Sequence, residues 1–479
     1  MTKMRNQIAK ITMSVLALVL VAGCGTSAKD GQDANPQPGS QQPKLVTSIE
    51  VALPPTYEDA NAFSEGLVWV MMHGKWGAVD KDFNQVIDFL YDDVLDFSQG
   101  RAGVSVQGKW GFVDNTGKII VEPTYIGVRS FSEGFATALC REIPVEIDPA
   151  TWGETGDKVT YYEGEWAVID QDGKEIFPCG SLNEVSDFNG GVAAATRKVG
   201  GEKPRRESLI VTSTGGEIVL DESLMFSNND FFDEEQFLGR QLSMLPPFSE
   251  GRREVCTADY ERQRVFCGYV DTSGTLVIEP RFAVARPFHD GLAVVGSRDE
   301  EYHITYSVIN TAGEDIPLQY PYSEISDFSE GFSFVKSDEY FAWGIIDTKG
   351  TEVVPPIFDI RSDSTQFHEG LKLAYLKRIR WIDTTGATVL YLNPDPPDNA
   401  SDEEVEAISE KRYIDGSEFS EGVARVVRDG DGGDILIGYI NTAGQELVEP
   451  IYYGAQSFQE GYAAMFDYQG MVGFLKITG

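Results

Sequence analysis

Side chains able to form covalent links are few in this chain of 479 residues, and four of its five cysteines stand in the body of the sequence, at Cys140, Cys179, Cys256 and Cys267. None has the C-x-x-C spacing of a redox pair or a zinc site. Cys256 and Cys267 flank a short polar segment almost symmetrically, as facing positions of a hairpin do, so a disulfide between them is the favoured interpretation. A Cys140–Cys179 bridge is a second hypothesis, and free buried thiols are the alternative.

Catalytic signatures are missing from the sequence, which has no H-E-x-x-H, no G-x-S-x-G and no phosphate-binding G-x-x-x-x-G-K-[ST]. His289 and His368 stand where most copies of a recurring turn phrase have Ser, so both are expected to be turn residues. Residues 429–434, DGDGGD, lack the spacing and the closing Glu of a calcium loop. We therefore predict no enzyme, no metal and no cofactor. The alternative is an envelope polysaccharide hydrolase whose carboxylates lie on insertions, since any of the 76 acidic residues could converge in space.

The amino-terminal segment has the order of parts found in an export signal. Three basic residues precede an uncharged, mainly apolar run over residues 11–21, which is too short to span a bilayer. Val21-Ala22-Gly23-Cys24 follows and resembles a bacterial lipobox. The resemblance implies cleavage before Cys24 and a diacylglycerol thioether on its sulfur; ordinary secretion with a free Cys24 is the alternative. We expect a lipoprotein signal peptide over residues 1–23 and a chain held at the cell membrane, facing outside the cytoplasm, through lipid on Cys24.

Residues 24–44 comprise the lipidated Cys24 and a stretch of Gly, Ser, Pro, Gln and Asp with no large apolar side chain. Such a composition cannot pack, so it predicts a flexible linker. The remainder, residues 45–479, contains the material for a core. The whole chain is 42% hydrophobic, yet it has 76 acidic against 39 basic residues and a formal net charge of −37. This charge repels phosphate backbones, so no nucleic-acid partner is expected.

One phrase, F-S-E-G with variations, recurs throughout residues 45–479. The first two intervals are both 34 residues and later ones reach 60, so the minimal unit is about 34 residues with insertions added. The ten copies begin at Phe63, Phe97, Phe131, Phe188, Phe248, Phe288, Phe328, Phe367, Phe419 and Phe458.

Each unit has the pattern of short β-strands. Small or β-branched residues stand second and fourth after the turn glycine, as at Ala102 and Val104, and this period of two indicates a strand. A Lys109-Trp-Gly-Phe-Val-Asp114 phrase follows, whose Trp we expect to be mainly buried. It ends in an Asx-x-x-Gly turn, because Asx bonds the turn backbone and Gly accepts a positive φ. A third stretch, residues 119–125, ends in Pro and an aromatic residue, which marks a strand end or edge.

These phrases resemble the WG, or KWG, repeat of bacterial surface and secreted proteins, and the resemblance extends over nearly all of residues 50–479. It implies an all-β array of about ten short antiparallel repeats used for interaction, and it implies no catalytic activity. The last copy lacks its final β-rich stretch, and residues 51–57 before the first copy supply a matching one. A closed, propeller-like ring joined by strands from both ends is therefore one hypothesis, and an open β superhelix is the other.

Insertions lengthen the repeat near residues 141–164, 221–245 and 393–415. In the last of these, Ser401 and Glu404 have capping-box spacing, so a short helix is expected there. Insertions on a repeat scaffold often decorate its binding face, and neutral loop growth is the alternative. From these features we expect a WG repeat-containing lipoprotein that binds or scaffolds another protein or an envelope polymer, such as a cell-envelope glycan, without catalysing a reaction.

Overall fold

The computed structural model describes residues 45–147, 159–200, 205–226, 245–259, 264–359, 366–376, 378–393, 401, 412–430 and 433–479. The expected signal peptide, Cys24, the linker and the helix beginning at Ser401 lie outside the described residues, apart from Ser401 itself.

The described chain forms ten small antiparallel sheets and has no helix, as the repeat pattern predicts. Each sheet is a simple meander, which we number 1 to 10 by the order of its second strand along the chain. Nine sheets have four strands; sheet 8 has three among the described residues. The first strands are very short: β2 (Asp59–Ala60), β6 (Asp93–Val94), β10 (Gly127–Val128), β14 (Glu184–Val185), β18 (Met225–Phe226), β22 (Val284–Ala285), β26 (Glu324–Ile325), β33 (Asp415–Gly416) and β37 (Gly454–Ala455).

The second and third strands form the central hairpin of each sheet. The second strands are β3 (Leu67–Met72), β7 (Arg101–Val106), β11 (Phe135–Ile147), β15 (Val192–Val199), β19 (Arg252–Asp259), β23 (Leu292–Arg298), β27 (Phe332–Ser337), β30 (Leu371–Leu376), β34 (Val423–Asp429) and β38 (Tyr462–Phe466). The third strands are β4 (Lys75–Asp80), β8 (Lys109–Asp114), β12 (Val159–Asp170), β16 (Arg205–Thr212), β20 (Arg264–Asp271), β24 (Ile304–Asn310), β28 (Ala342–Asp347), β31 (Arg378–Asp383), β35 (Ile435–Asn441) and β39 (Val472–Ile477).

The fourth strands carry the stretch that ends in Pro and an aromatic residue in most copies. In sheets 1 to 9 they are β5 (Gln85–Tyr91), β9 (Ile119–Tyr125), β13 (Glu175–Leu182), β17 (Glu217–Val219), β21 (Leu276–Phe282), β25 (Asp315–Ile316), β29 (Glu352–Phe358), β32 (Thr388–Tyr391) and β36 (Glu446–Tyr452).

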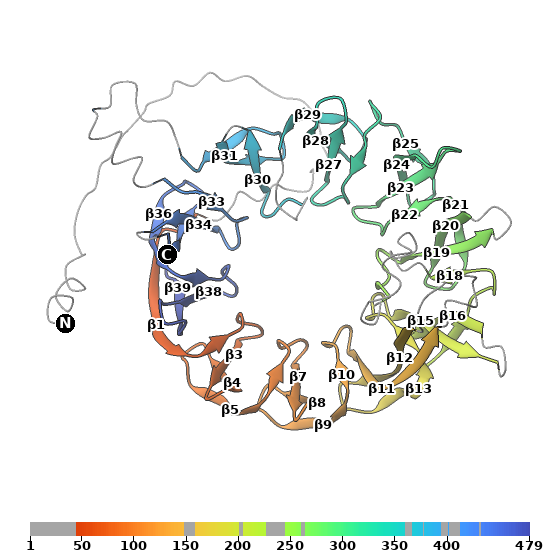
Figure 1. Cartoon of the computed structure of the whole chain (residues 1–479), viewed down its shortest axis with the longest axis horizontal. Helices are drawn as coiled ribbons and strands as arrows, with labels where there is room; N and C mark the ends of the chain where they lie inside the picture. Colours follow the sequence, from red (N-terminus) through yellow and green to blue (C-terminus); the bar gives the residue numbers. More distant parts are fainter. Residues whose placement is uncertain are drawn as a thin grey trace, which may run out of the picture. The chain divides into compact units, whose positions relative to one another are not determined.

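Sheet 10 is completed from the other end of the chain. Its fourth strand is β1 (Ile49–Tyr57), which pairs antiparallel with β39 so that Ile49 faces Ile477. The ten sheets therefore follow one another around a closed ring (Figure 1). Of the two hypotheses drawn from the sequence, the closed ring is correct and the open superhelix is wrong.

The hydrophobic core lies between neighbouring sheets. One cluster joins Trp69 and Trp76 of sheet 1 to Ala102 and Val113 of sheet 2, and similar clusters follow around the ring. Ala102, second after its turn glycine, is 1% exposed, which agrees with the close packing that small residues at this position predict.

The tryptophans of the Trp-Gly phrases divide into two groups. Trp76 and Trp166 are buried, whereas Trp110 and Trp343 are half-buried. The burial expected from the sequence is therefore complete for the first two rings and only partial for the other two.

The glycine of the Trp-Gly phrase permits a close approach by the fourth strand. A Cβ placed on Gly111 would lie 2.3 Å from the Val121 carbonyl oxygen and 2.7 Å from the Pro123 nitrogen. The pairing of β8 with β9 is irregular at this point, as at a bulge, and Pro123 needs no ladder partner there. The glycine of the Trp-Gly phrase and the later Pro thus lie on neighbouring strands at the point where the two backbones approach most closely.

Candidate binding face

The F-S-E-G phrase forms a two-residue hairpin turn that also contacts the next sheet. In sheet 1 the backbone groups of Ser64 and Leu67 exchange two hydrogen bonds, and the central Glu65 and Gly66 have φ of 54° and 81°. Two positive φ values define a type I′ turn, which explains the recurring glycine. The Phe63 ring is 1% exposed. His289 and His368 occupy the Ser64 position in their sheets, which confirms them as turn residues.

The acidic residue of this turn accepts hydrogen bonds from the turn of the following sheet. Glu65 Oε1 and Oε2 lie 2.6 Å and 2.7 Å from the backbone nitrogens of Gln99 and Gly100. The same contact crosses the closure of the ring, where Glu460 accepts from Glu65 and Gly66. The other interfaces repeat this bond, with a side-chain oxygen of the first residue accepting from the backbone nitrogen of the second. The pairs are Gln99 with Gly134, Glu133 with Gly190 and Gly191, Glu250 with Gly291, Asp290 with Gly331, Glu330 with Gly370, Glu369 with Gly422, and Glu421 with Gly461.

Among these turns, all of which the structure describes, one interface of the ten has no such bond. The turn of sheet 4 reads Phe188-Asn-Gly-Gly191, so Gly190 stands where the other turns have Glu, Asp or Gln. With no side chain at this position, sheet 4 offers no turn acceptor to sheet 5.

The serine of the phrase adds a second link of the same kind. The Ser64 hydroxyl donates to the Phe97 carbonyl oxygen at 2.7 Å, and Ser98 donates to the Phe131 carbonyl oxygen at the same distance. Equivalent bonds join Ser132 to Phe188, Ser249 to Phe288 and Ser420 to Phe458. The residues that recur most regularly in the sequence therefore hold neighbouring sheets together.

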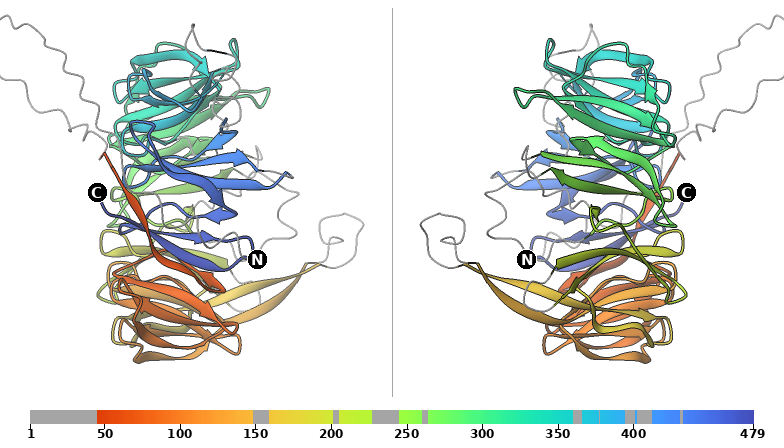
Figure 2. Two further views of the ribbon diagram at one scale, coloured as in Figure 1. Left: turned by 90° about the vertical axis from the view of Figure 1, so that its left-hand side faces the viewer. Right: turned by 90° about the vertical axis from the view of Figure 1, so that its right-hand side faces the viewer.

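Because each sheet is a meander, its connections divide between two faces of the ring. The turns joining first to second and third to fourth strands lie on one face, which we call the turn face. The hairpins joining second to third strands, and the links from one sheet to the next, lie on the other, which we call the hairpin face. The insertion near 141–164 lengthens the β11–β12 hairpin, which stands out from the hairpin face in Figure 2.

The other two insertions fall at different connections. The insertion near 393–415 follows β32 and reaches β33, whereas the insertion near 221–245 contains β18 and precedes β19; most of both insertions lies outside the described residues. Among the described acids of the insertions, Glu163 pairs with Lys198 and Arg206 of sheet 4, with its Oε1 3.7 Å from Arg206 Nη2. No observation on the described residues therefore favours the hydrolase alternative.

The hairpin tips differ among sheets in a way that the repeat does not require. In sheets 1, 2 and 10 the tip ends in glycine, at Gly74, Gly108 and Gly470, each with positive φ. In sheets 6 and 7 an aromatic residue takes the left-handed conformation instead: Tyr302 with φ of 68° and Phe341 with φ of 50°. Non-glycine residues adopt this region at a cost, which the chain also accepts at Glu65 of its first F-S-E-G turn; at these two tips the residue is aromatic.

These aromatic side chains are also solvent-exposed. Tyr302 is 66% exposed, Tyr340 63% and Phe341 83%, and Tyr320 in the link between the two sheets is 52% exposed. The neighbouring Glu339 carboxylate raises the pKa of Tyr340. The link that carries Tyr320, between β25 and β26, belongs to the same hairpin face as the two tips. The two tips, residues 299–303 and 337–341, read DEEYH and SDEYF, with five carboxylates and no Lys or Arg.

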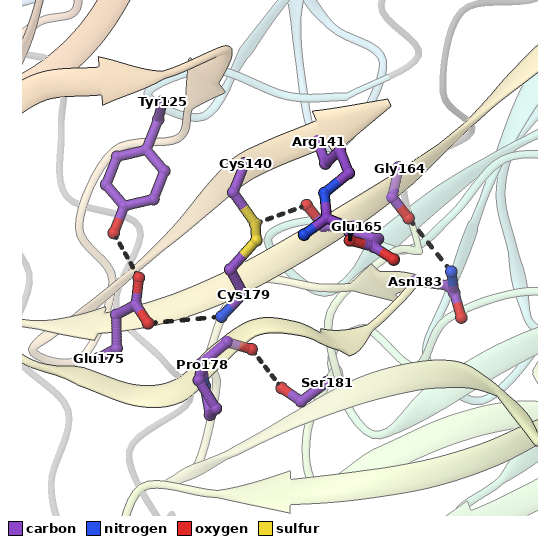
Figure 3. Close-up of a disulfide and its surroundings, with 10 residues drawn as sticks. All are labelled: Tyr125, Cys140, Arg141, Gly164, Glu165, Glu175, Pro178, Cys179, Ser181 and Asn183. Atoms are coloured by element: carbon purple, nitrogen blue, oxygen red, sulfur yellow. Dashed lines mark hydrogen bonds and ion pairs between the residues drawn. A yellow bond between two sulfur atoms is a disulfide. The ribbon is translucent and has the colours of Figure 1, made fainter. Parts of the chain in front are cut away.

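Both cysteine pairs of the sequence analysis form disulfides in the structure. Cys256 and Cys267 face each other on β19 and β20, with Cα atoms 4.0 Å apart. Cys140 on β11 is joined to Cys179 on β13 (Figure 3). Beside this bridge the Tyr125 hydroxyl of sheet 2 donates to Glu175 at 2.8 Å, so a contact between sheets lies next to it.

Two buried cations were missed by the sequence analysis. Arg253 is 2% exposed and Lys372 is fully buried, and both stand second after the turn glycine, where Ala102 and most equivalents are small. Lys372 Nζ donates to Glu418, and Arg253 pairs with the adjacent Glu254. Burial lowers the pKa of Arg253 to about 10. The break in the small-residue pattern was the available signal, and the pairing makes both residues structural features of sheets 5 and 8.

Neither a group of metal ligands nor a membrane-spanning helix is found in the part of the chain that the structure describes. No three His, Cys, Asp or Glu side chains are grouped there so as to hold a metal ion. The same residues contain no helix long and apolar enough to cross a bilayer.

Comparison with solved structures gives only distant matches. No curated protein matches the chain. Solved structures that match include the β-propeller domain of the Trilobed protease from Pyrococcus furiosus, at 10% identity over 62% of this chain and 95% of that one, with a TM-score of 0.26. An acylaminoacyl peptidase from Pyrococcus horikoshii matches at 11% identity over 66% of this chain and 51% of its own length, with a TM-score of 0.28. Similarity this distant gives no information on activity.

Ten antiparallel sheets in a ring, closed by a sheet built from both ends of the described chain, make the fold a ten-bladed β-propeller. Seven stretches of the sequence match the WG containing repeat, at residues 50–76, 76–110, 110–140, 166–197, 268–297, 343–360 and 437–465. The chain is therefore a WG repeat-containing protein.

Proposed function

We propose that this protein is a membrane-anchored, extracytoplasmic scaffold that binds another protein or an envelope polymer without catalysing a reaction. The observation that carries the proposal is that the turn face and the hairpin face differ in what their residues do. The recurring Phe, Ser, acidic and Gly residues serve contacts between blades, whereas the hairpin tips vary in length and chemistry. Repeat scaffolds that stack in this way present extended surfaces suited to binding.

The proposed location rests on the amino-terminal sequence. A basic segment, an apolar run of signal length and Val21-Ala-Gly-Cys24 occur in the required order. Both disulfides are consistent with an oxidising compartment outside the cytoplasm. Lipid chains on Cys24 would hold the protein at a membrane despite its net charge of −37, which opposes adsorption to an anionic surface.

The binding proposal is tested by retention of an envelope component. Full-length protein in neutral detergent is immobilised through a carboxy-terminal tag and incubated with a detergent extract of the envelope and, separately, with purified cell-wall glycans. We expect a component that is retained in saturable amounts and competed by free protein. A parallel screen with chromogenic glycosides should give no turnover above buffer. Turnover without any retained component would overturn the proposal in favour of a hydrolase.

A further inference from the structure

Each blade of the propeller is one of the sheets numbered above. The hairpin tips of blades 6 and 7 carry aromatic residues that folding does not explain. Tyr302 and Phe341 occupy left-handed backbone positions that other tips fill with glycine, and their side chains are 66% and 83% exposed. They therefore accept backbone strain without gaining burial in return. A strained, exposed aromatic residue is a reason to look for a function.

The charge around these rings indicates what they would bind. The two tips, residues 299–303 and 337–341, carry five exposed carboxylates and no Lys or Arg. Asp299 accepts hydrogen bonds from the backbone of Glu301 and His303, which fixes the first tip. Glu300 and Glu339 are both exposed to solvent. The patch thus combines exposed aromatic side chains with an excess of negative charge.

An ammonium or guanidinium group is attracted by both parts of such a surface. Aromatic faces attract cations through their quadrupole, and nearby carboxylates add charge-assisted hydrogen bonds. The chain already shows one such contact, with the Arg298 guanidinium carbon 5.8 Å from the Tyr302 ring centroid. Anionic polymers are disfavoured by the local charge and by the net charge of −37. A neutral glycan has no positive charge to pair with the carboxylates.

We propose that the patch formed by Tyr302, Tyr320, Tyr340, Phe341 and the carboxylates of the two tips docks a Lys- and Arg-rich segment of a partner protein. This inference rests on the proposed binding function and names the partner chemistry at one part of the hairpin face. The acidic field of the whole chain would speed the encounter, and the rings would determine where the basic segment settles.

The probe for the test is a fluorescein-labelled peptide of about ten residues that alternates Lys and Gly, titrated into the full-length protein in neutral detergent at about 150 mM salt, where surface charges are screened beyond roughly 8 Å. Because an acidic protein attracts such a peptide everywhere, the informative variants keep the charge. We expect the double variant Tyr302→Gly, Phe341→Gly to bind at least about tenfold more weakly than wild type. The matched control Tyr468→Ala removes a tyrosine that is 72% exposed at the tip of blade 10, and it should bind as wild type does.

A second pair of variants separates local from general charge. The double variant Glu300→Gln, Glu339→Gln should weaken binding at least about fivefold, whereas Glu122→Gln, Glu279→Gln, which removes two exposed acids from the fourth strands of other blades, should leave it within about twofold.

Two results would overturn the proposal. One is equal peptide binding by wild type and the double glycine variant. The other is tighter binding of chitosan or neutral glycan oligomers than of the peptide at the patch. Retention of an envelope component by the double glycine variant as well as by wild type would leave the proposed function standing and reject only this patch.

Discussion

At the scale of single residues, the acidic position of the F-S-E-G turn is the most informative. Its role was not predictable from the sequence, because the backbone groups that it binds belong to a turn 34 to 58 residues away, or almost 400 residues away where the ring closes. The turn itself was predictable, since Glu-Gly after Ser has a local signature. Local chemistry thus identified the turns, and contacts between blades explain why the acid recurs in them.

Gly190 allows this role to be tested by introducing the missing acceptor between blades 4 and 5. An alanine there should destabilise the protein by about 1 kcal/mol, because φ is 67° and disfavours a Cβ. A glutamate should be about 1–2 kcal/mol more stable than the alanine variant, since its carboxylate can accept from the Glu250 and Gly251 backbone. The space is open, because a Cβ placed on Gly190 would have no atom within 4 Å. Urea unfolding of Gly190→Ala and Gly190→Glu measures the difference, and equal stability would contradict the proposed link.

Phe341 is expected to contribute nothing to folding. Phe341→Gly should keep the free energy of unfolding within about 1 kcal/mol of wild type, because relief of strain at φ of 50° offsets the greater backbone entropy of glycine. Thermal unfolding followed by circular dichroism is the measurement. A loss above about 2 kcal/mol, a size typical of core truncation, would show that the ring packs against the blade.

Asp80 should make a pH-dependent contribution. Hydrogen bonds from the backbone and side chain of Asn84, with a further one from the Asp82 backbone, lower its pKa below that of an unfolded chain. A carboxyl with a lowered folded pKa stabilises the protein above its unfolded value, near pH ~4, and this stabilisation is lost as the pH falls through the folded value. The stability difference between wild type and Asp80→Asn should therefore be constant from about pH 5 to 7 and shrink below about pH 4. A difference that grows on acidification would have the wrong sign.

At the scale of strands, the sequence predicted the type of element well and the burial of individual side chains less well. The period of two, the Asx-x-x-Gly turns and the Pro positions all have local causes, and all appear in the structure. The burial of each Trp depends on what the neighbouring blade places against it. For this reason Trp166 and Trp110, which hold the same position in two copies of the phrase, differ in exposure.

This difference predicts unequal costs of truncation. Trp166 is 7% exposed and lies in a core cluster beneath the Arg129 guanidinium, whose central carbon is 4.6 Å from the ring centroid. Trp166→Ala should cost about 3–5 kcal/mol, and Trp110→Ala should cost clearly less because its half-buried ring leaves a smaller cavity. Denaturant unfolding of the two variants under identical conditions decides the order. Equal losses would mean that the exposure of the Trp ring does not set its contribution.

At the scale of the whole molecule, the closed ring depends on β1. The sequence allowed both closure and an open array, because an offset between the two ends fits either, and only pairing in three dimensions distinguishes them. That pairing is seen between β1 and β39. The candidate patch on blades 6 and 7 was equally invisible in the motifs, because its residues come from two tips and a link that share a face only once the meanders are built.

The proposed lipid anchor is tested at the same scale. Cys24→Ala should abolish lipid labelling and release the protein from the membrane fraction, or leave an unprocessed precursor, because one acyl chain or none gives at most marginal attachment. Metabolic labelling with a fatty acid and fractionation of the cells check both outcomes. Wild-type labelling and processing of the Cys24→Ala protein would show that the lipobox interpretation is wrong.

The shared sheet of blade 10 also bears on the order of folding. Ser48 and Thr478 are 430 residues apart in sequence, yet their hydroxyl oxygens are 2.9 Å apart, so ring closure is a contact of very high sequence separation. Such contacts form late, since the intervening chain must first be ordered. A chain that emerges from its amino terminus onward can therefore build blades 1 to 9 in turn, while β1 remains unpaired with its backbone groups exposed. Until β39 arrives, this edge is where a growing chain is most open to strand exchange with a second copy.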